Sequence, residues 1–363
     1  MPCVLVTGAN GFLAIHLLKQ LLEKSFDVIG TVRTDAKAEQ VIAAHPEFKD
    51  VVKFVSVPHM SARHAYKKIM EETEIDYIVH TAAPVPDSGG TDFDNDFLNP
   101  AVQGNIELLE SAHLYSKTVK HITVTGSSTS VHNAAEPSNG GTLTSNDWNP
   151  IEASIAREMQ NPRLSYAVSK TLADKAIWEY VEKAKPSFTV SVLLPPLIFG
   201  PPIQYLEKDA LTTGRANMTT DIFYSLFLNK NATAKDLTIA MGAAFYTAFI
   251  DVRDLAALHI RCFQISSEIW AKNGRLLLAA PEPFLPENVL RILQQKLPDA
   301  HERLASVPAA TIDVNGSRRL LKLDDSEARQ IFGDGIYRPL EQTVVDTARR
   351  LMHLEHSGSK QDT

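Results

Sequence analysis

Residues 1–14 read MPCVLVTGANGFLA, and this stretch decides the fold. Val4, Leu5 and Val6 form a short apolar run of the kind that is buried on both faces of a parallel sheet. Residues 7–11 interrupt this run with two glycines, and from Phe12 onward the apolar residues return at helical spacing. A strand, a glycine turn and a helix in this order favour phosphate binding, because the backbone can approach the ligand and the first helical N–H groups face an anion. The stretch therefore predicts a dinucleotide site.

The composition is that of an ordinary globular protein. The chain has 363 residues, of which 44% are hydrophobic and 22% charged, and its formal net charge is -7. This charge argues against nucleic acid or an anionic membrane as a partner. Two cysteines, Cys3 and Cys262, cannot build a disulfide framework, and the first apolar run is too short for a signal peptide. We expect a cytoplasmic protein with no metal site.

Further apolar runs alternate with helical segments along the chain. Strands are predicted over residues 26–32, 53–57, 75–79, 121–125 and 188–194, and the longest helices over 92–117 and 164–183. This alternation predicts an α/β fold of the Rossmann type, a doubly wound parallel sheet with helices on both faces. Beyond it we expect strands over 245–250 and 275–279, and helices over 217–228, 287–297 and 341–354.

These elements divide into two domains. Residues 1–200 are predicted to form the dinucleotide-binding domain with the catalytic residues, and a strand and a helix near 245–265 return to it. Residues 201–355 are predicted to be mainly a smaller, C-terminal substrate-binding lobe. The polar residues 356–363 are expected to be a disordered tail.

The second predicted strand ends at Arg33, with Lys37 one helical turn further on. NAD-binding units commonly place an acidic residue near this point to accept hydrogen bonds from the ribose. A guanidinium suits a 2′-phosphate instead, so the pair favours NADP. Asp35 is the nearby acid that keeps NAD open, and both cations are also compatible with a solvated helix start.

Hydroxyl side chains and a tyrosine–lysine pair follow the fifth predicted strand. Residues 127–130 read SSTS at the end of that strand, where open α/β sheets bind ligands, although a Ser/Thr-rich turn explains them equally well. Among nine tyrosines only Tyr166 has a lysine four positions later, and this spacing places Lys170 on the same helical face. We expect Lys170 and an oxidised nicotinamide to lower the tyrosine pKa from about 10. Tyr166 would then donate a proton to a carbonyl oxygen that Ser127 also binds.

Taken together, these features resemble the extended short-chain dehydrogenase/reductases over nearly the whole chain. Within them the chain is most similar to the dihydroflavonol reductase-like group, which includes yeast and fungal aldehyde and ketone reductases. The motifs that carry the resemblance are TGANGF at 7–12, the Ser127 turn, Tyr166-x-x-x-Lys170, the two prolines at 195–196 and FIDVRD at 249–254. The resemblance implies an NADPH-dependent carbonyl reductase with Ser127, Tyr166 and Lys170 as catalytic residues.

The chain departs from the family pattern at four places. Ala14 stands where the third glycine is usual, and residues 58–60 read PHM, with His59 in place of the usual Asp near the adenine. Ala101 stands where many members carry an Asn on the long helix, which puts a fourth catalytic residue in doubt. Gly126 replaces a common Ser, so alignment leaves both Ser127 and Ser128 as candidates, and we prefer Ser127.

The predicted ligand contacts follow from these motifs. Cofactor contacts are expected from the strand ends and from the catalytic pair: Thr7, Gly8, Asn10, Gly11, Phe12, Leu13, Arg33, Lys37, Thr81, Ala82, Tyr166, Lys170 and Pro195. Substrate contacts are expected from Ser127, Tyr166, Phe199, Tyr205 and Phe223, which predicts an apolar or aromatic aldehyde or ketone. The alternatives are a sugar-nucleotide epimerase or dehydratase and a non-catalytic NADP-binding protein. We expect a monomer or a homodimer.

Overall fold

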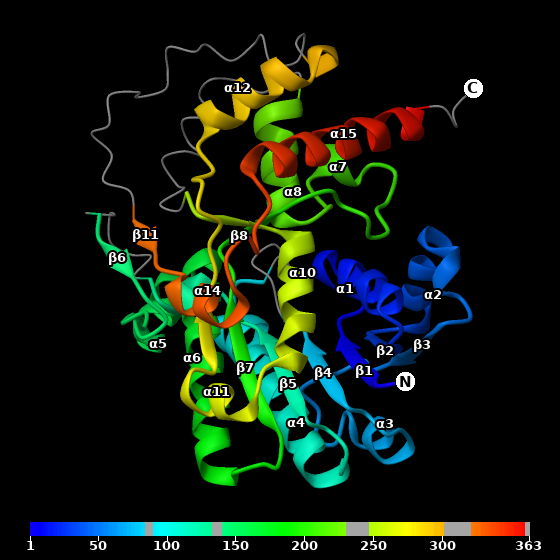
Figure 1. Cartoon of the computed structure of the whole chain (residues 1–363), viewed down its shortest axis with the longest axis vertical. Helices are drawn as coiled ribbons and strands as arrows, with labels where there is room; N and C mark the ends of the chain where they lie inside the picture. The colour runs from blue at the N-terminus through cyan, green and yellow to red at the C-terminus, as the bar shows by residue number, and fades with distance from the viewer. Residues whose placement is uncertain (84–89, 133–139, 230–246, 301–320, 360–363) are drawn as a thin grey trace.

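A seven-stranded parallel sheet forms the centre of the protein in a computed structural model that describes residues 1–83, 90–132, 140–229, 247–300 and 321–359 (Figure 1). The strand order is β10-β7-β5-β4-β1-β2-β3, and every neighbouring pair runs parallel. The strands are β1 (Cys3–Thr7), β2 (Asp27–Val32), β3 (Val52–Ser56), β4 (Tyr77–His80), β5 (His121–Thr125), β7 (Thr189–Leu194) and β10 (Arg275–Leu277). The strand order reverses between β1 and β4, where sheets of this kind bind ligands. The predicted fold class is confirmed.

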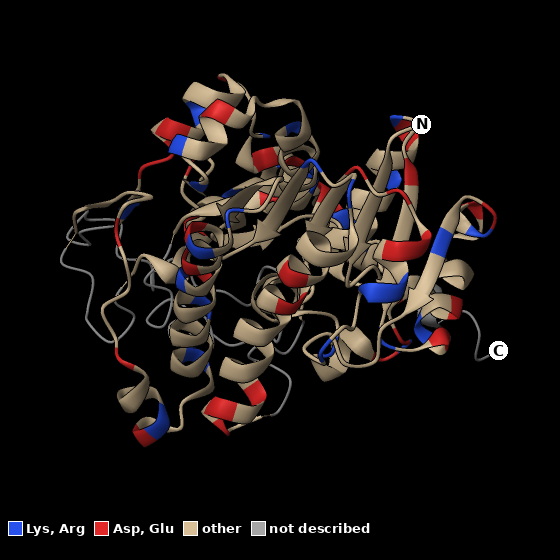
Figure 2. Cartoon of the chain, turned by 90° about the horizontal axis from the view of Figure 1, so that it is seen from below, with Lys and Arg blue, Asp and Glu red and all other residues tan. Residues whose placement is uncertain are grey.

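Helices cover both faces of this sheet. On one face α1 (Phe12–Glu23) packs against α10 (Val252–Arg261), and on the other α4 (Asn99–Tyr115) packs against α6 (Pro162–Ala184). Shorter helices join these elements: α2 (Asp35–Ala44), η1 (Pro46–Phe48), α3 (Lys67–Glu72), η3 (Phe93–Leu98), η4 (Ser128–Ser130), α5 (Ala153–Met159), η6 (Cys262–Gln264), α11 (Ser267–Lys272), η7 (Pro298–Ala300) and α14 (Ser326–Phe332). Figure 2 shows positive and negative positions mixed along the helices instead of gathered on one side.

The first strand is buried on both sides, as its composition predicts. Val4 and Val6 are fully buried in the hydrophobic core on one face of the sheet, and Leu5 is fully buried in the core on the other face. Alternate side chains of a strand point to opposite faces, so an unbroken apolar run serves two cores at once. Each such side chain stabilises the fold by about 1.5–3 kcal/mol.

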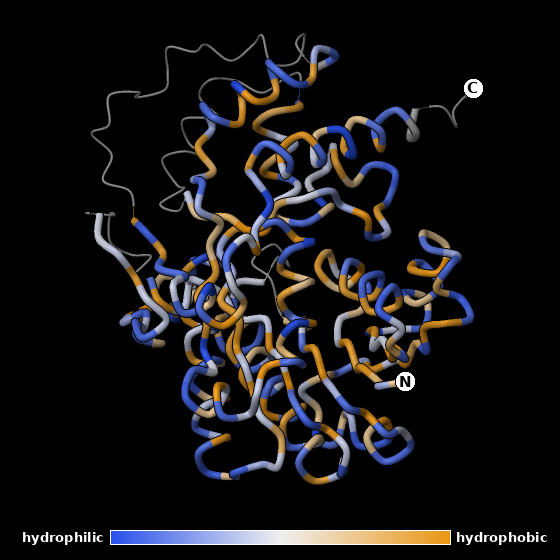
Figure 3. The backbone as a smooth tube through the Cα atoms, in the orientation of Figure 1, coloured by the Kyte–Doolittle hydropathy of each residue, from blue (hydrophilic) through white to orange (hydrophobic). Residues whose placement is uncertain are grey.

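A smaller C-terminal lobe has a hydrophobic core of its own. It is built from β8 (Leu197–Phe199), β9 (Phe249–Asp251), α7 (Ala210–Thr213), α8 (Met218–Phe223), η5 (Tyr224–Leu228), α12 (Pro286–Lys296) and α15 (Leu340–Ser359). Hydrophobic and hydrophilic stretches alternate along α12 and α15 in Figure 3, and the apolar faces of the two helices meet in this core.

Several boundaries differ from the sequence predictions. β10 and α14 fall in the range predicted for the lobe, but β10 is an edge strand of the large sheet and α14 packs against it, because Leu276 and Phe332 share the sheet core. α15 continues to Ser359, so the helix includes residues predicted as tail, and 360–363 lie outside the described residues. The strand predicted over 245–250 lies partly outside them too, and β9 begins at Phe249.

Two further features concern segments without a strong sequence pattern. β6 (Thr142–Leu143) and β11 (Lys322–Leu323) form a short parallel pair that joins the loop after β5 to the chain before α14. Within the described parts of the chain, no helix combines the length and apolar character needed to cross a membrane.

Candidate active site

The glycine turn after β1 leaves space and hydrogen-bond donors for an anion. Gly8 has a φ of +67°, and a Cβ there would lie 3.1 Å from the Cα of Ala82 at the end of β4. The Gly11 N–H donates to the carbonyl of Gly8 at 2.9 Å, and the first bond of α1 runs from the Ile15 N–H to the carbonyl of Gly11. The backbone N–H groups that precede Ile15 in the helix, beginning with that of Phe12, have no partner within α1. This cradle fits the phosphates of a dinucleotide.

Some of the predicted contacts at this turn can come only from the backbone. Leu13 is 7% exposed and packs in the core, so its side chain faces away from solvent. Asn10 is half-buried in the turn. Ala14 is fully buried in the core, so the methyl group at the position of the usual glycine is accommodated in the packing of the helix.

Thr7 ties the ends of β1 and β4 together. Its Oγ1 accepts hydrogen bonds from the N–H groups of Thr81 and Ala82, both at 3.2 Å, and lies 2.7 Å from His80 Nδ1. Burial lowers the pKa of His80 to about 3, so its ring is neutral and Nδ1 can accept the one hydroxyl hydrogen. The Thr81 hydroxyl in turn donates to the Thr7 carbonyl at 2.6 Å. The Thr7 side chain is thus fully used inside the protein and shapes the turn.

Two cations are exposed to solvent at the predicted adenosine end of the site. Arg33 follows the last residue of β2 and is exposed, as is Lys37, whose Nζ donates to Gln40 Oε1 at 3.0 Å. Asp35, the acid that would favour NAD, accepts a hydrogen bond from Ser56 at the end of β3. The cations therefore remain available to a 2′-phosphate, while the carboxylate already has a partner.

The residues that replace the usual Asp lie on this side of the sheet. His59 is exposed, and Met60 packs against the long helix, where its Cε lies 3.0 Å from the Cβ position of Gly104. Ala101, at the position where a fourth catalytic residue is common, is 5% exposed.

The structure brings the three predicted catalytic residues together beyond the end of β5. Asn161 caps the start of α6, and its side chain accepts from the N–H groups of Arg163 and Leu164 at 3.0 and 3.2 Å. This cap starts the helix so that Tyr166 lies in its first turns, hydrogen-bonded to Ser127. One turn further, Lys170 Nζ donates to the carbonyl of Thr125, the last residue of β5, at 3.0 Å.

The hydrogen bond to Tyr166 also separates the two candidate serines. Ser127 Oγ accepts from the hydroxyl of Thr129 at 2.9 Å and is 8% exposed. Ser128 is 3% exposed, and its N–H donates to the carbonyl of Pro195 at 2.9 Å. Gly126 has no space for a side chain, since its Cβ position lies 2.6 Å from Leu194 Cδ2. The geometry favours Ser127, and Pro195 anchors the turn.

The protonation states of the pair follow from burial. Burial raises the pKa of Tyr166, and the hydrogen bond to Ser127 opposes part of the rise. This direction differs from the lowering expected from the sequence, and it keeps the phenol protonated at neutral pH, which is the form that donates a proton. Burial lowers the pKa of Lys170 to about 8, and the carboxylate of Asp174 opposes that effect. A half-buried proton donor with a lysine ammonium one helical turn away suits acid catalysis on an oxygen atom.

A family comparison agrees with this geometry. The model of the NAD dependent epimerase/dehydratase family matches residues 4–271. The chain belongs to this family. Both the glycine turn and the Ser127–Tyr166–Lys170 group lie within the matched region.

Proteins with reductase names are similar to nearly the whole chain. An uncharacterized oxidoreductase of Schizosaccharomyces pombe is 33% identical over 96% of both chains. The NADPH-dependent methylglyoxal reductase of Saccharomyces cerevisiae is 30% identical, covering 97% of this chain and 98% of the relative. The crystal structure of Gre2 from Candida albicans in complex with NADPH covers 98% of this chain and 99% of its own, with 27% identity and a TM-score of 0.81. The resemblance to yeast reductases is confirmed.

The predicted substrate residues divide into buried and exposed ones. Phe199 and Phe223 are 2% and 0% exposed, and Phe199 stacks on Phe284 with 3.9 Å between ring centroids. Both rings fill the core of the C-terminal lobe, so in this structure neither offers a surface to a ligand. Tyr205 is 40% exposed. Aromatic residues between strands are ambiguous in a sequence, because core packing and ligand contact select the same side chains.

Sequence reasoning missed a buried ion pair next to Lys170. Asp174 lies one turn after Lys170 on α6, and its Oδ2 accepts from Arg275 Nε on β10 at 2.7 Å. The only signal was an arginine at the start of the otherwise apolar strand predicted over residues 275–279. Such a charge needs a buried partner, but the sequence does not say which carboxylate supplies it.

Proposed function

We propose that this family member is an NADPH-dependent carbonyl reductase that converts an aldehyde or ketone to an alcohol. The observation that carries the proposal is the hydrogen bond between Ser127 and Tyr166, with Lys170 one turn further on the same helix. The names of the yeast methylglyoxal reductase and of Gre2 in complex with NADPH support the same activity and cofactor.

The residues present fit the cofactor. Gly8 and the start of α1 would hold the diphosphate, Arg33 and Lys37 would bind the 2′-phosphate, and Lys170 would reach the ribose hydroxyls of the nicotinamide half. NADPH, when bound, supplies the hydride that is transferred to the carbonyl carbon. The exposed cations favour NADP over NAD, because a carboxylate at that position would repel a phosphate.

The side chains of the group have separate tasks in this reaction. Ser127 donates a hydrogen bond to the carbonyl oxygen and holds it beside Tyr166. Tyr166 gives that oxygen the phenolic proton as the carbon is reduced, so the product is an alcohol and the tyrosine becomes a phenolate. The Lys170 ammonium stabilises the phenolate by its charge. Proton donation of this kind accounts for about 10²- to 10⁴-fold in rate.

The proposal also covers the substrate class, the cellular location and the oligomeric state. We propose an apolar or aromatic aldehyde or ketone, with methylglyoxal included because of the yeast relative, and an enzyme that acts in the cytoplasm as a monomer or homodimer. A carbonyl panel, cell fractionation and light scattering test these three points separately. The epimerase alternative predicts tightly retained nucleotide after purification, whereas the reductase must exchange NADPH with solvent.

Turnover of a carbonyl panel with NADPH and NADH tests the central proposal. Tyr166→Phe removes the proton donor and lowers kcat by about 10²- to 10⁴-fold. Arg33→Asp lowers the preference for NADPH over NADH by about 10- to 100-fold, since it removes a charge-assisted hydrogen bond worth about 1.5–3 kcal/mol. Tyr180→Phe is the matched control, because this tyrosine lies further along the same helix, outside the predicted site, and its variant keeps full turnover. Full turnover in Tyr166→Phe contradicts the mechanism.

A further inference from the structure

Asp174 places a buried negative charge behind the catalytic lysine. The residue is 2% exposed and follows Lys170 by one turn of α6, on the same face of the helix. Its Oδ2 accepts from Arg275 Nε at 2.7 Å, and its Oδ1 accepts from Trp178 Nε1 at 3.0 Å. Both carboxylate oxygens are therefore held in one orientation by partners from two elements.

Arg275 joins this carboxylate to the loop that contains the catalytic serine. The side chain is 9% exposed and begins on β10, at the edge of the sheet. Its Nη1 donates to the carbonyls of Ser145 and Asp147, the latter at 2.8 Å, and its Nη2 donates to the carbonyl of Ser130 at 3.4 Å. Ser130 is three residues after Ser127, so one guanidinium connects the serine turn to the helix that carries the tyrosine and the lysine.

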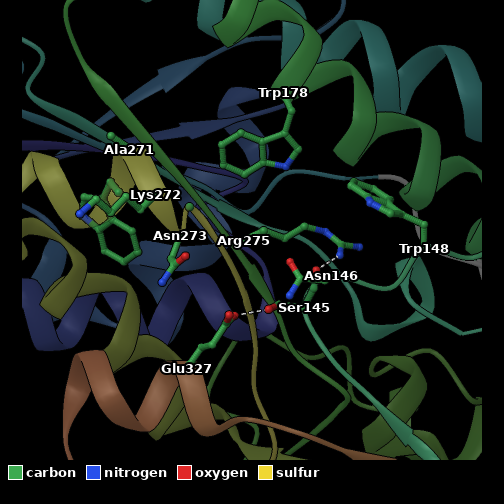
Figure 4. A pocket seen from close by; sticks show the side chains of 11 residues that line it. Ser145, Asn146, Trp148, Trp178, Ala271, Lys272, Asn273, Arg275 and Glu327 are labelled. Atoms are coloured by element: carbon green, nitrogen blue, oxygen red, sulfur yellow. Dashed lines mark hydrogen bonds between the residues drawn. The ribbon is translucent and has the colours of Figure 1, made fainter.

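The outer side of the ion pair borders a hollow of about 270 Å³ (Figure 4). Arg275 lies there between labelled tryptophans, and its guanidinium carbon is 3.7 Å from the ring centroid of Trp148. All three tryptophans of the chain, Trp148, Trp178 and Trp270, line this hollow. None of the predicted cofactor or substrate residues lines it. The hollow gives small solutes a route to the guanidinium position.

Stability alone is a weak reason for two charges in this position. Burying both ions costs desolvation energy, and well-packed apolar residues of similar volume are often at least as stabilising as a buried ion pair. The contacts of this pair instead lead to both halves of the proposed catalytic group.

We propose that Asp174 and Arg275 are positioning residues of the reductase, which set the Ser127 turn against α6 and hold a carboxylate one helical turn from Lys170. The inference rests on the proposed function, because it assigns a purpose to the pair only if the tyrosine and the lysine carry the reaction.

The groups that face Lys170 define the expected pH effect. Tyr166 and Asp174 come from α6, the carbonyl of Thr125 from β5 and the neutral ring of His80 from β4. Of these groups Asp174 is the one that favours the ammonium through its negative charge. Asp174→Asn removes this charge at constant shape, so the alkaline limb of the kcat profile moves about one pH unit lower.

Two variants of Asp174 form the main experiment. Asp174→Asn is expected to lower kcat about fivefold at pH 8, as a one-unit shift of the limb requires, with less than a threefold change in KM. Asp174→Glu is expected to restore the wild-type pH profile. An alkaline limb that stays within 0.3 pH units (~0.4 kcal/mol) of wild type in Asp174→Asn overturns the proposed role of the carboxylate.

A double variant separates positioning from folding. Asp174→Leu with Arg275→Met replaces the pair by apolar side chains, and we expect this variant to fold with a melting temperature close to that of wild type. A positioning role predicts at least a tenfold loss of kcat and a shifted alkaline limb in this folded protein. Wild-type kcat and pH profile in the double variant overturn the proposal.

Chemical rescue provides an independent measurement. In Arg275→Ala the hollow beside Trp148 admits a guanidinium ion, so millimolar guanidinium is expected to raise kcat severalfold, while equimolar urea is expected to have no effect. Tyr166→Phe, measured in parallel, keeps the two proposals distinguishable. If Tyr166→Phe is inactive and the pH profile of Asp174→Asn is unshifted, only the positioning role is contradicted. If Tyr166→Phe is fully active, both the positioning role and the proposed function are contradicted.

Discussion

Replacing Thr7 by valine tests whether the turn after β1 is held together by one hydroxyl. Valine has the shape of threonine but no oxygen, so it leaves the N–H groups of Thr81 and Ala82 and the Nδ1 of His80 without their partner. Thr7 and His80 are 0% and 2% exposed, so both lie out of contact with bulk solvent.

The free-energy cost can be estimated from these three contacts. An unsatisfied buried donor or acceptor costs about 1–3 kcal/mol. Thr81 and Ala82 are half-buried, so water can partly replace the lost partner of their amides. The expected loss in the free energy of unfolding is therefore about 2–5 kcal/mol, a large share of the about 5–15 kcal/mol that is typical of folded proteins.

Urea denaturation followed by tryptophan fluorescence measures this loss. Thr7→Ser is the matched control, because it keeps the oxygen and removes one methyl group at a cost of about 1 kcal/mol. The midpoint of Thr7→Val is expected below that of Thr7→Ser at an equal m-value. Equal midpoints for the two variants refute the hydrogen-bonding account of this turn.

Two further predictions concern pH and the glycine turn. Burial lowers the pKa of four histidines to about 4, 3, 3 and 4, namely His16, His80, His121 and His259. These histidines bind protons near pH 6.5 in the unfolded chain but not in the folded chain, so their contribution to the free energy of unfolding is complete above pH 7. As the pH drops below 6.5, the free energy of unfolding falls by about 1.4 kcal/mol for each histidine and each pH unit. Urea midpoints at pH 7.5 and 5.5 test this, and equal midpoints contradict it. Gly8→Ala is expected to weaken NADPH binding at least tenfold, because the new methyl group meets Ala82 in addition to the backbone cost of about 1–2 kcal/mol for a positive φ. Gly214→Ala is the control. Gly214 has a similar φ of +66° but nothing within 4 Å of its Cβ position, so this variant is expected to keep the wild-type affinity. Equal affinities in a fluorescence titration of the two variants contradict the close approach at Gly8.

The fold class was predictable from local patterns. An apolar run such as residues 4–6 has to be buried on both faces, and helices at regular intervals between such runs require parallel strands. These rules act over a few residues, so a sequence displays them directly. Domain boundaries depend on long-range packing, which is why β10 and α14 join the sheet although they lie far beyond residue 200.

By itself, the sequence determined the glycine turn after the first strand, the two cations that follow the second strand and the one-turn spacing of Tyr166 and Lys170, because each depends on neighbouring residues. Only the tertiary structure decided that Ser127 contacts Tyr166, that Phe199 and Phe223 pack in a core, and that Arg275 pairs with Asp174. These contacts join residues that are 24 to 101 positions apart, and burial sets their charge states. Physical chemistry predicts that a buried arginine needs a partner, but the fold selects which one.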